Sequence, residues 1–109
     1  MDIRAAYSSR GAAEVLFPAT VATAPRYFVG SRTHAMHEAF VADSSAGPVE
    51  VVDNVSLAPR VPVNAGDNIL VKGEMVHDKG RIPVVHWTHH DPSQRHEDGF
   101  IRFQGRVYA

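Results

Sequence analysis

The chain has 109 residues, 44% of them hydrophobic, and its formal net charge is −1 when the histidines are neutral. This length suits one domain with a modest core, and the charge gives no sign of a strongly basic nucleic-acid-binding surface. Cysteine is absent, which excludes disulfides, thiolate zinc sites and a cysteine nucleophile. Protonation of the seven histidines below about pH 6.5 would make the chain positive and favour anions.

No targeting or membrane-spanning segment stands out. Residues 1–4 are not followed by the apolar stretch of a signal peptide. No apolar run approaches the roughly 20 residues that a transmembrane helix needs. We therefore expect a soluble cytoplasmic protein with no membrane partner, either as a monomer or as a homo-oligomer.

The N-terminal part of the chain changes character after its first dozen residues. Residues 1–12 are rich in alanine and serine, and we expect a short helix or a disordered arm before a single barrel domain at 13–109. Residues 15–23 predict one strand, broken or bulged at Pro18 because proline cannot donate a ladder hydrogen bond. Residues 25–32 follow as a turn-rich link.

The middle of the chain predicts a hairpin and a connector. Residues 38–41 form a short strand, the segment 44–48 is a hairpin loop rich in serine, glycine and proline, and residues 49–52 are the returning strand. Two prolines make 54–64 a connector, with one helical turn at 56–58.

The clearest predicted strand follows Gly66 and Asp67, because every second residue from 69 to 75 fits an inward-facing position. The elements expected after it are a turn at 77–80, a strand at 82–88, a polar loop at 91–99, and strands at 100–103 and 106–108 around a turn at 104–105.

Short strands dominate this pattern. Five or six of them at spacings of roughly 8–12 residues, without a long amphipathic helix, favour a small barrel or sandwich. Gly66 and Gly73 bracket a strand in a way that is common where a strand curls through a small barrel. We predict an all-β fold, a small five- to six-stranded barrel like the oligonucleotide/oligosaccharide-binding fold (OB-fold), with an SH3-like barrel or small sandwich as the alternative.

A histidine-rich segment near the C-terminus gives the strongest indication of a functional site. Four of the seven histidines fall within residues 86–96, together with Trp87, Thr88, Asp91 and Arg95. Such side chains are costly to bury unpaired and add little to a core. Their grouping therefore points to metal binding, proton transfer or anion binding.

Strand alternation sorts this segment into two faces. A continuous strand would place His86, Thr88 and His90 on one face, and Trp87 and His89 on the other. We expect Trp87 to pack in the core, with stacking against a base or sugar ring as its other role.

Three functional hypotheses fit the segment, and the first is metal binding. Imidazole and carboxylate suit a divalent metal such as Zn, Ni, Cu or Fe. The sequence contains no recognised zinc signature. The candidate ligands are His86, His90, Asp91 and His96.

The second hypothesis is metal-free hydrolysis of a phosphodiester, with His86 and His90 as general base and general acid near neutral pH. Thr88 and Arg60 would hold the phosphate, and Asp91 would orient a histidine. The tripeptide that begins at His86 matches the His-x-Thr element of two-histidine phosphoesterases, but the chain lacks the second such element that those enzymes need.

The third hypothesis is binding without catalysis, in a pocket for a nucleotide, a sugar or a short strand, as small barrels commonly provide. The candidate ligand-binding residues are His37, Arg60, Trp87, His89, Arg95 and His96. The alternative to all three hypotheses is a hydrogen-bonded loop with exposed histidines, in which Asp91 starts a turn before Pro92.

A smaller polar group lies earlier in the chain. His34 and His37 stand close to Arg32 and Glu38. A solvated loop explains this group, and the functional alternative places one of the two histidines across a groove from His86.

Several segments together resemble one family. The seven-residue run His-Trp-Thr-His-His-Asp-Pro at 86–92, with segments 54–62, 66–67, 96–101 and 105–108, is similar to bacterial proteins of domain-of-unknown-function family 3465. Glu38 stands where that family usually has Gln. The resemblance implies one shared design but no activity, and the residues it groups are His37, Asn54, Arg60, His86, Thr88, His89, His90, Asp91 and His96.

Family members often look exported, whereas the absence of a leader here suits a cytoplasmic or phage-borne member. We predict that the barrel engages a phosphate-bearing ligand, a nucleotide or nucleic acid, at residues 86–96, with phosphodiester hydrolysis as the favoured reaction. The alternatives are a non-catalytic module that sequesters a nucleotide, and a metal-binding protein with histidine and aspartate ligands.

Overall fold

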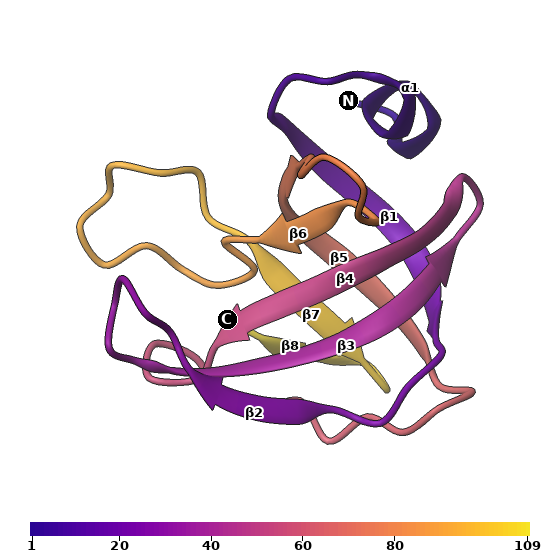
Figure 1. The fold of residues 1–109 in the computed structure, drawn as a ribbon. Coiled ribbons are helices and arrows are strands. Elements are labelled where there is room, and N and C mark those ends of the chain that lie inside the picture. The colour runs from indigo at the N-terminus through magenta and orange to yellow at the C-terminus, as the bar shows by residue number, and fades with distance from the viewer.

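Strands and one short helix make up the fold, which the computed structural model describes for residues 1–109 (Figure 1). The elements are α1 (Ile3–Ser8), β1 (Ala13–Val21), β2 (Arg26–Val29), β3 (Met36–Ser44), β4 (Gly47–Asn54), β5 (Asn68–Val76), β6 (Val84–His86), β7 (Phe100–Phe103) and β8 (Arg106–Tyr108).

Five of the strands close into a barrel in the order β1-β3-β4-β6-β5, because β5 pairs back with β1. All of these pairings are antiparallel except β4 with β6, which is parallel. This is the Greek-key barrel of the OB-fold type, so the predicted all-β barrel is confirmed. Strand β2 extends the sheet beside β3, and β7 and β8 extend it beside β5.

Apolar side chains form one core of 19 buried residues, most of them on the inner faces of the strands. In β1 and β5 the burial alternates residue by residue, as expected for strands with one face inward. Helix α1 covers one end of the barrel (Figure 1), and its Ile3 and Ala6 join the same core. The segment expected to be a helix or an arm is therefore a docked helix. No helix here has the length and apolar character to cross a membrane.

Two local expectations about the first strands are wrong. Strand β1 runs unbroken through Pro18, which pairs with Leu70 of β5. Its opposite edge pairs with β3 only at Thr20 and Val21, and proline is tolerated at such a free edge. The predicted link at 25–32 contains strand β2, whose residues are largely exposed and so lack the alternation that marks a half-buried strand.

The long loop between β6 and β7 projects from one side of the barrel (Figure 1). Both flanking strands pair with the same edge of β5, β6 with residues 74–76 and β7 with residues 70–72. The loop therefore leaves and rejoins the sheet at nearly the same place. Gly99 makes this closure possible, because a Cβ there would collide with the carbonyl oxygen of Trp87. The Gly99 N–H instead donates to the His89 carbonyl oxygen at 2.9 Å.

Candidate functional site

The outer face of β3 and β4 carries the polar residues nearest to the histidine-rich segment. His37 is the cross-strand partner of Asn54, and β4 runs parallel to β6 with Val51 opposite Val85. Because Val51 and Val85 are fully buried, alternation turns Asn54 and His86 outward on the same face.

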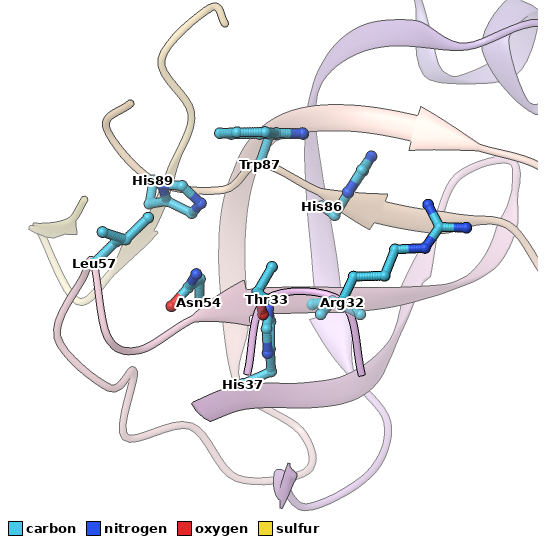
Figure 2. Close-up of a pocket in the computed structure, with 9 residues that line it drawn as sticks. Arg32, Thr33, His37, Asn54, Leu57, His86, Trp87 and His89 are labelled. Atoms are coloured by element: carbon cyan, nitrogen blue, oxygen red, sulfur yellow. The ribbon is translucent and has the colours of Figure 1, made fainter. Parts of the chain in front are cut away.

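A cavity of about 450 Å³ lies over this face (Figure 2). Its walls come from the β2–β3 loop, β3, β4, the connector after β4, and the end of β6. The lining residues are Arg32, Thr33, His37, Val52, Asn54, Leu57, His86, Trp87 and His89. We call this cavity the histidine pocket. It contains one arginine and three histidines but no carboxylate, a composition that favours an anionic ligand.

His37 is held in place by its neighbours on two sides. Its Nδ1 lies 2.9 Å from the Ala35 carbonyl oxygen. Its ring stacks on Phe28 of β2, with the ring centroids 5.5 Å apart and 17° between the planes. The structure therefore brings His37 into the pocket with His86, as the functional alternative predicted, and leaves His34 out.

Trp87 ends strand β6 and breaks the predicted alternation. Its φ of 55° lies in the left-handed region, where a strand cannot continue. The ring is half-buried, lines the histidine pocket and stacks on His96 at 4.3 Å and 10°. Because Trp87 does not belong to the buried core, the expectation of core packing is wrong.

The predicted face of His86, Thr88 and His90 does not form, because the turn at Trp87 sends Thr88 inward. Thr88 is fully buried, and its hydroxyl donates to the Val52 carbonyl oxygen and to Asp53 Oδ1, both at 3.0 Å. It therefore cannot hold a phosphate in the pocket.

His89 and His90 have different surroundings. His89 is buried, lines the pocket, and has Nδ1 2.8 Å from the His90 carbonyl oxygen. His90 is exposed, and its Nδ1 lies 2.9 Å from Asp98 Oδ2. Because His90 does not line the pocket, the structure does not support the predicted acid–base pair of His86 and His90.

Asp91 organises the loop that follows. Its carboxylate accepts hydrogen bonds from the Ser93 N–H and hydroxyl and from the N–H groups of Arg95 and His96, at 2.7–3.0 Å. These hydrogen bonds, the Ser93 hydroxyl first, lower the pKa of Asp91 to about 2. Asp91 thus caps its own turn, as expected for the hydrogen-bonded loop that was the alternative to the three functional hypotheses. It neither contacts a histidine ring nor joins a metal-ligand group.

The two arginines predicted to bind ligand lie outside the histidine pocket. Arg60 is exposed, and its guanidinium lies 4.6 Å from the centre of the Tyr27 ring. Arg95 is an exposed loop residue. Sequence reasoning instead missed Thr33, Val52 and Leu57 as lining residues, because only the pairing of distant strands brings them together.

Two buried acids face each other on the inner side of the pocket's strands. Glu38 of β3 and Asp53 of β4 are cross-strand partners, and neither is exposed. Glu38 accepts hydrogen bonds from the Tyr27 hydroxyl and the Val61 N–H. Asp53 accepts one from Thr88 through Oδ1, while its Oδ2 has no partner. Burial, with a smaller contribution from the nearby Glu38, raises the pKa of Asp53 to about 7, although the Thr88 hydrogen bond opposes this shift.

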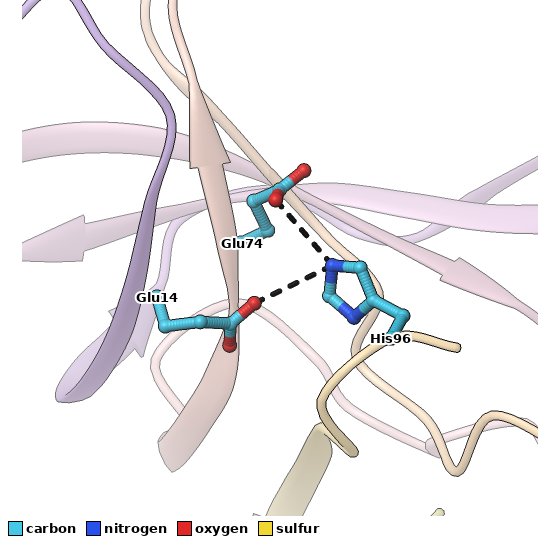
Figure 3. Close-up of side chains that lie close together, drawn as sticks. All are labelled: Glu14, Glu74 and His96. Atoms are coloured by element: carbon cyan, nitrogen blue, oxygen red, sulfur yellow. Dashed lines mark hydrogen bonds and ion pairs between the residues drawn. The ribbon is translucent and has the colours of Figure 1, made fainter. Parts of the chain in front are cut away.

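A second group of titratable side chains meets at His96, whose ring stacks on Trp87 (Figure 3). His96 Nε2 lies 3.4 Å from Glu74 Oε2 and 3.5 Å from Glu14 Oε1. The other oxygen of Glu74 lies 2.9 Å from His86 Nε2. We call Glu14, Glu74 and His96 the carboxylate–histidine cluster. The predicted metal set of His86, His90, Asp91 and His96 does not gather, and neither glutamate was predicted.

The environment of this cluster shifts two of its pKa values. Burial raises the pKa of Glu14, and the Glu97 and Glu74 carboxylates add to this effect while His96 opposes it. Burial alone would lower the pKa of His96. The Glu97 carbonyl and the two glutamates outweigh that effect, so the pKa of His96 is raised.

Comparison with known proteins identifies the lineage of the chain. Residues 21–109 match the family described as "Protein of unknown function (DUF3465)". The chain belongs to this family. The match is longer than the segments whose motifs suggested it, and it covers the whole histidine pocket. Of the carboxylate–histidine cluster, Glu14 lies outside the matched residues. No curated protein and no solved structure matches the chain.

Proposed function

We propose that this protein binds a phosphate-bearing ligand, a nucleotide or a nucleic-acid strand, in the histidine pocket. One observation carries the proposal: the pocket gathers a guanidinium and three imidazoles and includes no carboxylate. A phosphate would find hydrogen-bond donors there, with Arg32 able to bind two of its oxygens at once.

The position of the pocket supports the same conclusion. It lies on the outer face of β3 and β4, which are the second and third strands of the barrel. OB-fold proteins commonly bind oligonucleotides on this face, together with the loop between the first two barrel strands. Here that loop contributes Arg32 and Thr33.

The aromatic side chains suit a base or a ribose. Trp87 lines the pocket, and the stacked pair of Phe28 and His37 lies beside it. A base stacked on an aromatic ring gains roughly 1–3 kcal/mol, whatever its sequence. The ligand would then be held by its phosphate at Arg32 and by its base at Trp87.

Phosphodiester hydrolysis is the second candidate, and one contact favours it. His86 Nε2 lies 2.9 Å from Glu74, and a carboxylate that orients an imidazole is a recurring part of general-base sites. His37 or His89 would then supply the acid, because His90 lies outside the pocket.

The chain's only tryptophan provides a direct test, because it lines the pocket. Titration with a nucleoside 5′-monophosphate, a short single-stranded DNA and inorganic phosphate should change the Trp87 fluorescence. Arg32→Ala should weaken binding about tenfold, as the loss of one charged contact predicts. Arg102→Ala, an exposed arginine on β7, is the matched control and should bind like the wild type.

Two outcomes decide between the candidates. Recovery of the bound DNA intact after prolonged incubation would exclude hydrolysis and leave the binding function. If none of the three ligands binds, or if Arg32→Ala and Arg102→Ala behave alike, the proposed function is wrong.

A further inference from the structure

The carboxylate–histidine cluster joins three segments that are far apart in sequence. Glu14 lies on β1, Glu74 on β5, and His96 in the loop between β6 and β7 (Figure 3). One ligand atom from each lies within 4.8 Å of the other two. All three side chains are partly buried.

The distances in the cluster are long for ion pairs. Charge-assisted hydrogen bonds between nitrogen and carboxylate usually measure about 2.7–2.9 Å, whereas His96 Nε2 lies 3.4 and 3.5 Å from its two carboxylate oxygens. In a tetrahedral site with bonds of about 2.1 Å, neighbouring ligand atoms are roughly 3.4 Å apart. The two separations from His96 therefore match neighbouring ligands around a metal ion, and the two carboxylate oxygens lie within 4.8 Å of each other.

The proton position on His96 points to the same need for a cation. Its Nδ1 lies 2.7 Å from the Glu97 carbonyl oxygen. Because a carbonyl only accepts hydrogen bonds, Nδ1 must carry the proton. In the neutral ring Nε2 is then a lone pair that faces two carboxylate oxygens. Three acceptors converge, and only an additional proton or a metal ion can lie between them.

Two further features prepare the cluster for a cation. Glu14 Oε2 is buried without a hydrogen-bond donor. The His96 ring stacks on Trp87, and the backbone N–H of His96 donates a hydrogen bond to Asp91 Oδ2 at 2.8 Å. Metal-binding histidines commonly donate their other ring N–H to a carbonyl, as His96 does to Glu97.

We propose that Glu14 Oε1, Glu74 Oε2 and His96 Nε2 bind one divalent transition-metal ion. One imidazole and two carboxylates suit Zn²⁺ and its neighbours better than Mg²⁺, which prefers oxygen ligands alone. Three protein ligands leave a fourth position for water or another molecule, as in catalytic zinc sites. The second carboxylate oxygen of Glu74, Oε1, is hydrogen-bonded to His86 Nε2. The metal site does not depend on the ligand proposed for the histidine pocket.

Calorimetric titration of ZnCl₂ into protein purified without a polyhistidine tag and stripped with a chelator tests the site. We expect one Zn²⁺ per chain at micromolar metal. Glu14→Gln, Glu74→Gln and His96→Ala should each lower the affinity at least tenfold. His90→Ala is the matched control, because it removes an exposed histidine from the same loop, and it should bind Zn²⁺ like the wild type.

A second measurement does not depend on the folding of any variant. Co²⁺ bound by the wild-type chain in a tetrahedral or five-coordinate site absorbs visible light strongly, whereas octahedral Co²⁺ held mostly by water absorbs weakly. Strong absorption that Zn²⁺ displaces would support the proposal. The proposal is overturned by the absence of stoichiometric Zn²⁺ binding, or by binding that His90→Ala removes and Glu14→Gln leaves unchanged.

Discussion

The histidine pocket and the carboxylate–histidine cluster share one segment of the chain but differ in the acids around their histidines. In the pocket, His37, His86 and His89 line a cavity with Arg32 and no carboxylate. In the cluster, His96 faces two glutamates. Trp87 contacts both sites, since it lines the pocket and stacks on His96. Glu74 also contacts both sites, because its other oxygen lies 2.9 Å from His86 Nε2 of the pocket. Neighbouring strands, and not the histidine motif alone, therefore determine whether an imidazole faces an open cavity or a pair of carboxylates.

The largest effect on both sites is expected from Asp91→Ala. The substitution removes the acceptor for hydrogen bonds from Ser93, Arg95 and His96, so the 91–99 loop should lose its fixed conformation. Both Zn²⁺ binding and ligand binding should fall together, because His96 and Trp87 support each other. Hydrogen exchange of the loop amides measures the loss of order. If the loop amides stay protected and both affinities stay unchanged, the coupling through Trp87 is wrong.

The next largest effect concerns the pH dependence of the protein's stability. It comes from Asp53, which lies on the inner side of the pocket's strands and not in the carboxylate–histidine cluster. The pKa of Asp53 rises from 3.8 to about 7 on folding. Between these two pH values, the folded state therefore keeps a proton that the unfolded chain has lost. The stability from this group is complete below about pH 4 and is lost as the pH rises to about 7. At about 1.36 kcal/mol for each pKa unit, the loss is roughly 4 kcal/mol.

Asp53→Asn does not titrate and should therefore remove this loss. Urea unfolding at pH 4.5 and pH 7.5 should show the variant gaining stability relative to the wild type at the higher pH. The Zn²⁺ affinity should not change, because Asp53 belongs to the inner side of the pocket's strands. If the unfolding free energies of the two proteins changed with pH in the same way, folding would not raise the pKa of Asp53.

Trp87→Ala should have a smaller effect that differs between the two sites. Loss of base stacking should weaken nucleotide binding by about 1–3 kcal/mol. Zn²⁺ binding should weaken less, because Trp87 orients His96 without contacting the metal. Calorimetry is the measurement, since the variant lacks the only tryptophan. If the affinity for Zn²⁺ fell more than the affinity for the nucleotide, the main role of Trp87 would be at the metal site and not in stacking on a base.

The barrel was predictable because its signals are local. Alternation along 69–76 and the turn residues at 44–48 predict strands and hairpins without knowledge of tertiary contacts, and both match the structure. Strand β2 was not predictable in this way, since its mostly exposed residues give no alternation.

The site was predictable only in part. The histidine motif indicated the correct region, but the left-handed backbone at Trp87 reversed the side of Thr88, which no periodicity could reveal. Glu14 and Glu74 are distant from His96 in sequence. They meet it only because β1 and β5 pair along most of their length and the loop closes over them.

Our central proposal is that one segment serves an anion site and a cation site that bind their ligands independently, although Glu74 contacts a histidine of each. Arg32→Ala and Glu14→Gln test it most directly, because Arg32 lines the histidine pocket, Glu14 is part of the carboxylate–histidine cluster, and neither belongs to both sites. Titration of both variants with ZnCl₂ and with single-stranded DNA should show Arg32→Ala losing only the DNA and Glu14→Gln losing only the metal. Loss of both ligands in either variant, or of neither in both, would contradict the account.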